Sequence, residues 1–220
     1  MEGKGLSELQ RRVLEVLAGT EPPWTLTGGG ALVGIHLKHR TTRDLDLFWH
    51  GQDHLGPERE ECARRLKADG LQVESIQREP AFERILVSAP GERVVVDLVA
   101  EPVPTIEAPV QIEFGRASVL VDTMHEILVN KLCALLGRSE LRDLQDVEAL
   151  LASGGELDRA LRDAPSKDGA FSPVTLAWVL RGLPIENLAG AADIGPQEAS
   201  RLARFRDELV DRLVRASQPE

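Results

Sequence analysis

The chain has 220 residues, of which 42% are hydrophobic, so it is long enough for one large domain or two small ones with a buried core. Its 36 acidic residues outnumber its 26 basic residues, and the net charge of −10 argues against indiscriminate nucleic acid binding. No segment approaches the roughly 20 apolar residues of a membrane span, and the N-terminal segment MEGKGLSELQRR lacks the apolar region of a signal peptide. We therefore expect a cytoplasmic protein with no membrane partner.

The two cysteines, Cys62 and Cys133, fall in helical patterns and form no CxxC motif. We expect reduced thiols rather than a disulfide or a zinc site. Two histidine pairs have spacings that suit a transition metal, but nothing else in the sequence supports a closed zinc site, so we expect surface histidines. These pairs are His36 with His39 and His50 with His54.

The first predicted element is an amphipathic N-terminal helix that Gly19 and Pro22-Pro23 end. Its apolar side chains are Leu6, Leu9, Val13, Val16 and Leu17. Trp24 to Thr27 is then predicted to form a short strand that leads into the turn Gly28-Gly29-Gly30. A helix from Ala31 to Lys38 is expected next.

Strands dominate the next part of the chain, interrupted by one helix from Pro57 to Asp69 that Gly70 ends. A strand from Arg43 to Trp49 precedes this helix. The strands expected after it are Leu71–Gln77, Phe82–Ser88, Arg93–Val99, and a hairpin of Val110–Phe114 with Ala117–Val121.

From Asp122 onward the pattern turns helical. Asp122-Thr123 with Glu126 resembles a capping box that opens a helix to Leu136, and Ser139 is predicted to cap the next helix, which ends near Ala152. Further helices are expected at Leu157–Asp163, Pro173–Leu183 and Pro196–Ala216. The predicted architecture is a mixed-sheet α/β domain, residues 1–122, followed by a helical domain, residues 123–220.

Two aspartates lie one residue apart inside the apolar strand Arg43 to Trp49. Because side chains alternate between the faces of a strand, Asp44 and Asp46 share one face while Leu45 and Leu47 take the other. Two like charges held close together favour a bound cation, and Mg²⁺ prefers such oxygen ligands. Mg²⁺ keeps coordination positions for water and substrate phosphates, as in phosphoryl and nucleotidyl transfer, so we predict a divalent metal site.

The glycines Gly28, Gly29 and Gly30 precede a predicted helix N-terminus, where backbone N–H groups can hold a phosphate. The segment is neither GxxxxGK[ST] nor GxGxxG. A basic run that includes Arg40 follows and places positive charge just before the aspartates, where phosphates would lie. A plain tight turn and a solvated helix end remain alternative interpretations.

At these residues the chain resembles a known family. The segment GGGALVGIHLKHRTTRDLDLF is similar to the first motif of the AbiEii/AbiGii-type nucleotidyltransferases, toxins of bacterial toxin–antitoxin and phage-defence systems within the polymerase-β-like superfamily. That superfamily has a third acidic residue on a later strand, and the resemblance places it at Asp97, the single charge in the apolar run Val94 to Val99. Many members have Gly-Ser where this chain has only glycines, so backbone amides would bind the phosphates, helped by Thr27, Thr41 or Thr42.

A second segment, Asn130 to Val147, is similar to the Lys-x-x-Ala-Leu-x-x-Arg and Arg-Asp-x-x-Asp patterns of these toxins. It implies nucleotide-binding roles for Lys131, Arg138, Asp143 and Asp146. Lys131 and Arg138 are two turns apart on one helix face, from which they could reach a triphosphate or an acceptor. A solvated helix face would give the same pattern for the two aspartates.

The resemblance implies a Mg²⁺-dependent nucleotidyltransferase domain followed by a helical domain. Asp44, Asp46 and Asp97 would form a two-metal site, with Mn²⁺ as an alternative ion, and Lys131 would assist. An acceptor hydroxyl would attack the α-phosphorus of a nucleoside triphosphate, and pyrophosphate would leave. The implied acceptor is RNA, with tRNA as the favoured example, and the implied protein partner is an antitoxin.

Two other functions fit the same residues. The first is nucleotide transfer to a small hydroxylated molecule such as an antibiotic, because lincosamide-modifying enzymes share a similar Gly-Gly and Asp-x-Asp layout; the segment from Lys131 to Asp146 favours the toxin. The second is a catalytically silent nucleotide-binding module that acts through a protein partner. The sequence leaves open which base is transferred, because base choice depends on pocket shape.

Overall fold

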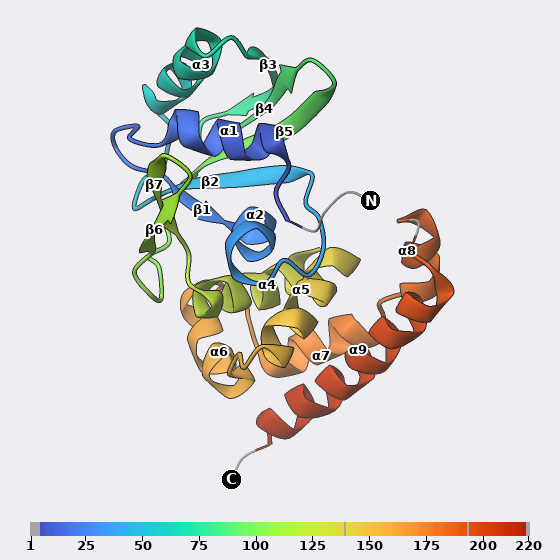
Figure 1. Ribbon diagram of the computed structural model, residues 1–220. Helices are drawn as coiled ribbons and strands as arrows, with labels where there is room; N and C mark the ends of the chain where they lie inside the picture. Colours follow the sequence, from blue (N-terminus) through green and yellow to red (C-terminus); the bar gives the residue numbers. More distant parts are fainter. Residues whose placement is uncertain (1–4, 139, 193, 219–220) are drawn as a thin grey trace. The chain divides into compact units, whose positions relative to one another are not determined.

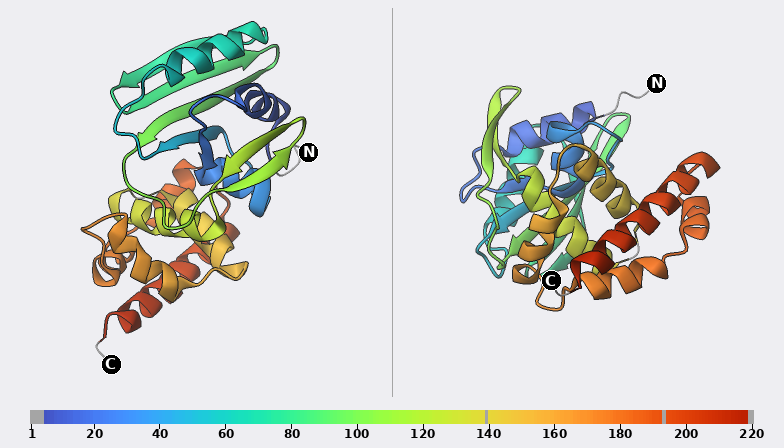
Figure 2. Two further views of the ribbon diagram at one scale, coloured as in Figure 1. Left: turned by 90° about the vertical axis from the view of Figure 1, so that its left-hand side faces the viewer. Right: turned by 90° about the horizontal axis from the view of Figure 1, so that it is seen from below.

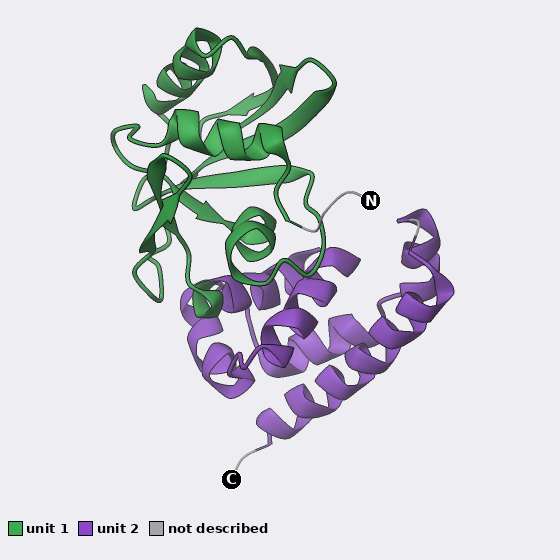
Figure 3. Cartoon of the chain, in the orientation of Figure 1, with its two compact units in different colours: residues 1–126 green, residues 127–220 purple. Residues whose placement is uncertain are grey.

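The computed structural model describes residues 5–138, 140–192 and 194–218. The chain divides into two compact units, residues 1–126 and residues 127–220 (Figure 3). This division falls inside helix α4 (Met124–Gly137), and the domain boundary between residues 122 and 123 stays a prediction. In the described part of the chain, no helix has both the length and the apolar character that crossing a membrane requires.

Unit 1 is built on a mixed sheet with the strand order β3-β4-β5-β2-β1-β7-β6 in the described residues (Figure 1). Two neighbouring pairs, β2 with β5 and β1 with β7, are parallel, and the other neighbours are antiparallel. The predicted strands all form, which confirms the mixed α/β fold. They are β1 (Thr25–Thr27), β2 (Asp44–His50), β3 (Gln72–Glu79), β4 (Phe82–Ala89), β5 (Glu92–Glu101), β6 (Val110–Phe114) and β7 (Ala117–Val121).

Two helices pack on one face of this sheet (Figure 2). Helix α1 (Glu8–Leu17) begins after Ser7, which forms a capping box with Gln10: the Ser7 hydroxyl accepts a hydrogen bond from the Gln10 amide, and the Gln10 side chain accepts one from the Ser7 amide. Helix α1 contacts both β5 and α3 (Glu58–Ala68), and α3 contacts β3. The two predicted helices therefore share one layer.

The side chains of β2 alternate between a buried face and a half-exposed face. Leu45, Leu47 and Trp49 are buried, whereas Asp44 and Asp46 are half-buried. Because the apolar side chains form the core with the helix layer, the two carboxylates point to the opposite face of the sheet. The period-two pattern of the sequence thus predicted the correct face for both aspartates.

A short helical segment follows β1 directly. Helix α2 (Gly28–Ala31) continues as a π-helix over Leu32–His36. The predicted glycine turn followed by a helix from Ala31 to Lys38 is therefore wrong at both ends. Gly28 alone makes the turn, with φ of 57°, so the two glycines after it are already helical, and Lys38 ends the segment in a left-handed conformation with φ of 50°.

Unit 2 is helical. After α4 it contains α5 (Leu141–Ala152), α6 (Leu157–Asp163) with a 3₁₀ turn at Ala164–Ser166, α7 (Pro173–Arg181), α8 (Ile185–Ala191) and α9 (Pro196–Ala216). Helix α9 packs against α5, α7 and α8. Helix α8 is not predicted by the sequence patterns, because its sequence IENLAGA has no clear apolar stripe. The predicted cap Ser139 lies outside the described residues, and Glu140 precedes α5 at the N-cap position.

The predicted cap of α4 is formed by Thr123, whose hydroxyl accepts a hydrogen bond from the Glu126 amide at 3.1 Å. The buried Glu126 carboxylate also accepts hydrogen bonds from the amides of Ile106 and Glu107, at 2.7 and 3.1 Å. These bonds tie the loop before β6 to the first turn of α4, which gives this carboxylate a structural role.

Both cysteines are free thiols. Burial raises the pKa of Cys62 to about 12 and that of Cys133 to about 11, from an ordinary value of 9.0. Because the thiolate is the reactive form, we expect native Cys62 to react with a disulfide reagent at pH 8 about a thousandfold more slowly than an unfolded thiol. Labelling followed by mass spectrometry measures this, with the protein in denaturant as the control. Fast labelling of Cys62 in the native protein would contradict the burial.

Candidate active site

The predicted carboxylates form a row across neighbouring strands. Asp46 on β2 lies opposite Asp97 on the parallel strand β5, and Asp97 lies opposite Arg84 on the antiparallel strand β4. Thr27 on β1 lies opposite Asp46 on its other side. Because residues directly opposite each other in a sheet point to the same face, these side chains project together. Asp44, two residues before Asp46, belongs to the same face.

Arg84 binds the Asp97 carboxylate with two hydrogen bonds. Its Nε donates to Oδ1 at 2.8 Å, and its Nη2 donates to Oδ2 at 2.7 Å. The Asp97 side chain is 9% exposed, whereas that of Arg84 is 42% exposed. The hydrogen bond to Asp97 raises the pKa of Arg84 most, burial opposes it, and the charges of Asp97, Asp44 and Asp46 raise it further. The guanidinium therefore lies in the field of all three carboxylates.

Arg84 is not among the residues that the sequence predicts for the site. The signal was present, because Arg84 is a charge inside the apolar strand from Phe82 to Ser88, the same anomaly that drew attention to Asp44 and Asp46. The pairing of β4 with β5, which places Arg84 opposite Asp97, could not be read from a pattern within one strand.

The residues predicted to bind phosphate gather around the first turn of α2. A Cβ atom at Gly29 would lie 3.1 Å from both the Arg40 Nη2 and the Thr42 Oγ1 atoms. The Thr42 hydroxyl in turn donates to the Asp44 Oδ1 atom at 2.8 Å. The structure therefore brings Gly29, Arg40, Thr42 and Asp44 together. Gly30 has another environment, because its Cβ would lie 3.0 Å from the buried Leu26 side chain.

Gly28 sits directly beneath the Asp46 carboxylate. A Cβ atom at Gly28 would lie 2.4 Å from the Asp46 Oδ2 atom, and the φ of 57° is one that other residues rarely adopt. Any other residue at this position would place its Cβ atom where the Asp46 carboxylate lies. This explains on physical grounds why the segment begins with glycine.

We expect Gly28→Ala to abolish the function of this site. Gly51→Ala is the matched control, because Gly51 also has a positive φ of 77° but no atom within 4 Å of its Cβ position. Both variants should lose about 1 kcal/mol of unfolding free energy from backbone strain. Only Gly28→Ala should displace the Asp46 carboxylate and lower nucleotide transfer, which urea unfolding and a transfer assay measure. Equal transfer by the two variants would contradict a role for this contact.

A second group of predicted residues lies in unit 2, between α4 and α5. The ammonium group of Lys131 lies 2.7 Å from Asp143 Oδ1 and 2.9 Å from Asp146 Oδ2, and all three side chains are buried. The Nε of Arg138 donates to Asp143 Oδ2 at 2.8 Å from a side chain that is 55% exposed. The alternative of a solvated helix face is therefore wrong for Asp143 and Asp146.

Burial lowers the pKa of Lys131, but the charges of Asp146 and Asp143 outweigh burial, so the pKa lies above its ordinary value of 10.5. Lys131 is consequently an ammonium ion at neutral pH. It can hold carboxylates or phosphates but cannot act as a general base.

A third pair of ionisable residues lies at the end of β7. Asp122 is fully buried, and its Oδ1 atom lies 3.5 Å from the Nε2 atom of His50, while its backbone carbonyl is 2.8 Å from the Nε2 atom of His36. The His50 side chain is 16% exposed, so the expectation of a surface histidine is wrong there. The sequence patterns did not predict this pair: β2 extends one residue beyond the predicted strand to include His50, and the approach of Asp122 depends on the pairing of β7 with β1.

The side chains of the row fit a divalent cation. Carboxylate oxygens are the donors that Mg²⁺ prefers, and Asp44 and Asp46 present theirs on one half-exposed face, with the Asp46 carboxylate next to the space that a Cβ at Gly28 would fill. The Asp97 carboxylate is held by Arg84. Within residues 5–138, 140–192 and 194–218, no three His, Cys, Asp or Glu side chains are grouped closely enough to hold a metal.

Most of the chain, including the segments that hold the carboxylate row and the glycine turn, is matched by a family of known proteins. Residues 12–217 match the family of nucleotidyl transferase AbiEii toxins of type IV toxin–antitoxin systems. The chain belongs to the AbiEii family. No curated protein is similar enough to count as a match.

Solved structures show the AbiEii-family chain to have a nucleotidyltransferase fold. JHP933 from Helicobacter pylori is 19% identical with a TM-score of 0.55, over 97% of each chain. MenT4, a nucleotidyltransferase toxin from Mycobacterium tuberculosis, is 16% identical with a TM-score of 0.59, over 96% of this chain and 91% of MenT4. As an AbiEii-type nucleotidyltransferase toxin, the chain acts on a nucleotide, and a type IV system implies an antitoxin partner.

Proposed function

We propose that this AbiEii-family toxin transfers a nucleoside monophosphate from a nucleoside triphosphate to a hydroxyl group of an RNA, with Mg²⁺ as its metal and tRNA as the favoured acceptor. The observation that carries the proposal is the row of Asp44, Asp46 and Asp97 on one sheet face, beside the Gly28 turn. This arrangement combines oxygen donors for a hard cation with a backbone turn that phosphates can approach.

Asp44 and Asp46 are the residues we assign to the metal, with Asp97 as the third carboxylate. When bound, a divalent ion supplies charge neutralisation and orientation of the triphosphate, and Mn²⁺ can replace Mg²⁺ in such oxygen sites. The Thr42 hydroxyl, 2.8 Å from Asp44 Oδ1, holds that carboxylate in a fixed orientation. Gly28 leaves Asp46 its place above the turn.

The phosphates are assigned to the turn and its basic neighbour. Gly28, Gly29 and Gly30 contribute backbone N–H groups, and the Arg40 guanidinium, which lies over Gly29, contributes positive charge. The Asp97 carboxylate orients the acceptor hydroxyl. That oxygen forms a bond to the α-phosphorus, the bond to the pyrophosphate oxygen breaks, and the hydroxyl proton passes to a carboxylate or to water.

The predicted residues in unit 2 are a buried cluster of Lys131, Asp143 and Asp146, and the partly exposed Arg138. Lys131 would have to give up buried ion pairs with Asp143 and Asp146 to contact a nucleotide. The Arg138 side chain is 55% exposed, although it binds Asp143 with two hydrogen bonds and lies 3.9 Å from the Glu140 carboxylate. We therefore assign phosphate contact in this group first to Arg138, and to Lys131, Asp143 and Asp146 the positioning of that arginine.

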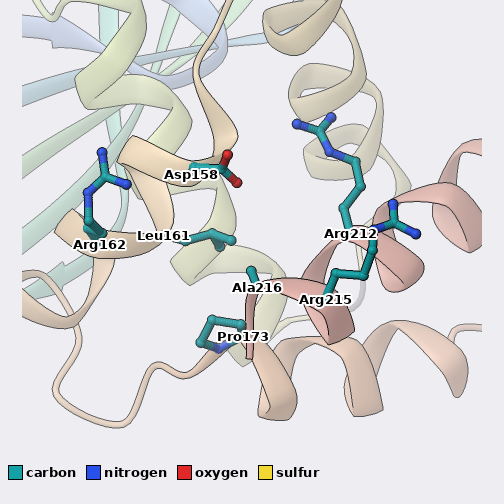
Figure 4. A pocket seen from close by; sticks show the side chains of 7 residues that line it. All are labelled: Asp158, Leu161, Arg162, Pro173, Arg212, Arg215 and Ala216. Carbon is teal, nitrogen blue, oxygen red and sulfur yellow. The ribbon is translucent and has the colours of Figure 1, made fainter. Parts of the chain in front are cut away.

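A basic groove in unit 2 supports an RNA acceptor. It has a volume of about 600 Å³ and lies among α6, the start of α7 and the end of α9 (Figure 4). Its lining residues are Asp158, Leu161, Arg162, Pro173, Arg212, Arg215 and Ala216. In the described part of the chain, none of its three arginine side chains forms an ion pair or a hydrogen bond. Because the whole chain has a net charge of −10, an RNA must be bound by such a local group of cations.

If this groove binds RNA, replacing its arginines should weaken RNA binding. Arg212→Glu combined with Arg215→Glu should weaken binding of total tRNA by at least about tenfold and reduce the slope of log affinity against log salt by about two. The control is Arg204→Glu, an exposed arginine of the same helix outside the groove. Fluorescence anisotropy at several salt concentrations measures both quantities. If the double variant and the control bind RNA alike, the groove is not the RNA surface.

The proposed reaction is tested by incubating the protein with Mg²⁺, each α-³²P-labelled nucleoside triphosphate in turn, and total RNA. We expect one triphosphate to label an RNA band, and Asp44→Asn to remove that label. Label that appears only in small molecules would favour an antibiotic-type acceptor and refute the RNA proposal. If no label forms but expression of the natural chain and of Asp44→Asn inhibits growth equally, the results favour the catalytically silent module.

A further inference from the structure

Arg84 lies at the end of the carboxylate row and supplies positive charge beside its three carboxylates. Asp46, Asp97 and Arg84 occupy one level of three adjacent strands, and Asp44 lies on the same face of β2. Three carboxylates so placed repel one another in the absence of a cation. The Arg84 guanidinium is bound to one of them by two hydrogen bonds and is within the electrostatic reach of the other two.

We propose that Arg84 is the built-in counter-ion of this row and competes with the divalent cation for Asp97. In the protein without nucleotide, Arg84 occupies both oxygens of Asp97, so a metal ion has Asp44 and Asp46 as its carboxylate ligands. Recruitment of Asp97 to the metal requires Arg84 to leave. The inference rests on the proposed function in that it assumes a divalent ion at this site.

The surroundings of Arg84 allow that exchange. Its side chain is 42% exposed, so the guanidinium can leave Asp97 for water or for a phosphate without losing a buried environment. Its Cζ atom lies 5.7 Å from the centre of the Phe82 ring, a cation–π contact with the neighbouring side chain on the same strand. Asp97 is nearly buried and cannot follow it. The mobile partner of the pair is therefore the arginine.

The alternative interpretation is that Arg84 and Asp97 form a purely structural salt bridge. In that case, removing Arg84 would lower stability and leave metal affinity unchanged or weaker. As a counter-ion, Arg84 opposes the metal, so its removal must tighten metal binding. The two readings thus predict opposite signs for one measurement.

The test is a titration of the full chain with Mn²⁺ alone, followed by the electron paramagnetic resonance signal of free Mn²⁺. Arg84→Gln should bind Mn²⁺ at least about tenfold more tightly than the natural chain, because a positive charge next to the ion is lost. Arg84→Lys keeps the charge but not the two-pronged contact, so it should bind about threefold more tightly. Arg78→Gln is the matched control: it removes an exposed arginine whose ion pair is with Glu60, and its affinity should not change.

Thermal unfolding with and without Mn²⁺ gives a second readout, and the ion should raise the melting temperature of Arg84→Gln more than that of Arg78→Gln. The inference is overturned if the Arg84 variants, or the one of them that folds, bind Mn²⁺ no more tightly than the control. The titration uses neither nucleotide nor acceptor, so it is independent of the transfer assay. Failed transfer to RNA with tighter Mn²⁺ binding would refute the proposed acceptor and leave the inference standing.

Discussion

Asp44→Asn and Asp46→Asn are each expected to lower nucleotide transfer by at least about a hundredfold while leaving the fold intact. Each substitution keeps the shape of the side chain and removes one negative charge from the face that must hold a cation. Because the two carboxylates repel each other in the absence of metal, we expect the melting temperature of each variant to stay the same or to rise. Transfer of labelled nucleotide under saturating Mg²⁺ and a thermal melt measure the two effects.

The matched control for these variants is Asp53→Asn. Asp53 follows β2 closely in sequence, but its side chain is 80% exposed and its partner is His54, away from the row. It should transfer nucleotide at the rate of the natural chain. Retained transfer in both Asp44→Asn and Asp46→Asn would show that the row is not the metal site, and the proposed mechanism would then fail.

Lys131→Met is expected to destabilise the chain by about 3–5 kcal/mol, because it removes the buried cation that Asp143 and Asp146 share. Arg138→Met removes a guanidinium that is 55% exposed and should cost about 1–2 kcal/mol. Urea unfolding at pH 7 measures both values. If the two variants lose the same unfolding free energy, the buried ion pairs of Lys131 do not contribute the additional stability that we expect.

The pH dependence of this cluster has a definite sign. The pKa of Lys131 is raised above its ordinary value of 10.5, so its ion pairs contribute fully at lower pH and are lost only as the pH rises through the higher, folded value. The stability difference between the natural chain and Lys131→Met should therefore be constant from pH 7 to pH 9. A catalytic role that is independent of structure would appear instead as lost transfer with unchanged stability.

The local patterns predicted what depends on neighbouring residues in the chain. The alternation in β2 placed Asp44 and Asp46 on one face, and the apolar run around Asp97 marked a central strand. The local patterns gave the wrong ends for the helical segment after β1. There the positive φ angles of Gly28 and Lys38 determine where the segment begins and ends. Neither angle follows from residue type alone, although glycine permits the first.

The family resemblance, the order of the elements apart from α8, and the charged residues within apolar strands all follow from local sequence patterns, because hydrophobic period, glycine turns and motif spacing are properties of one stretch of chain. Which of these charged residues contact one another depends on how the strands pair and the helices pack. The pairing of β4 with β5 placed Arg84 on Asp97, and the packing of α4 with α5 buried Lys131 between two aspartates. Such contacts join residues far apart in the chain, and they depend on strand register and burial, which no local pattern contains.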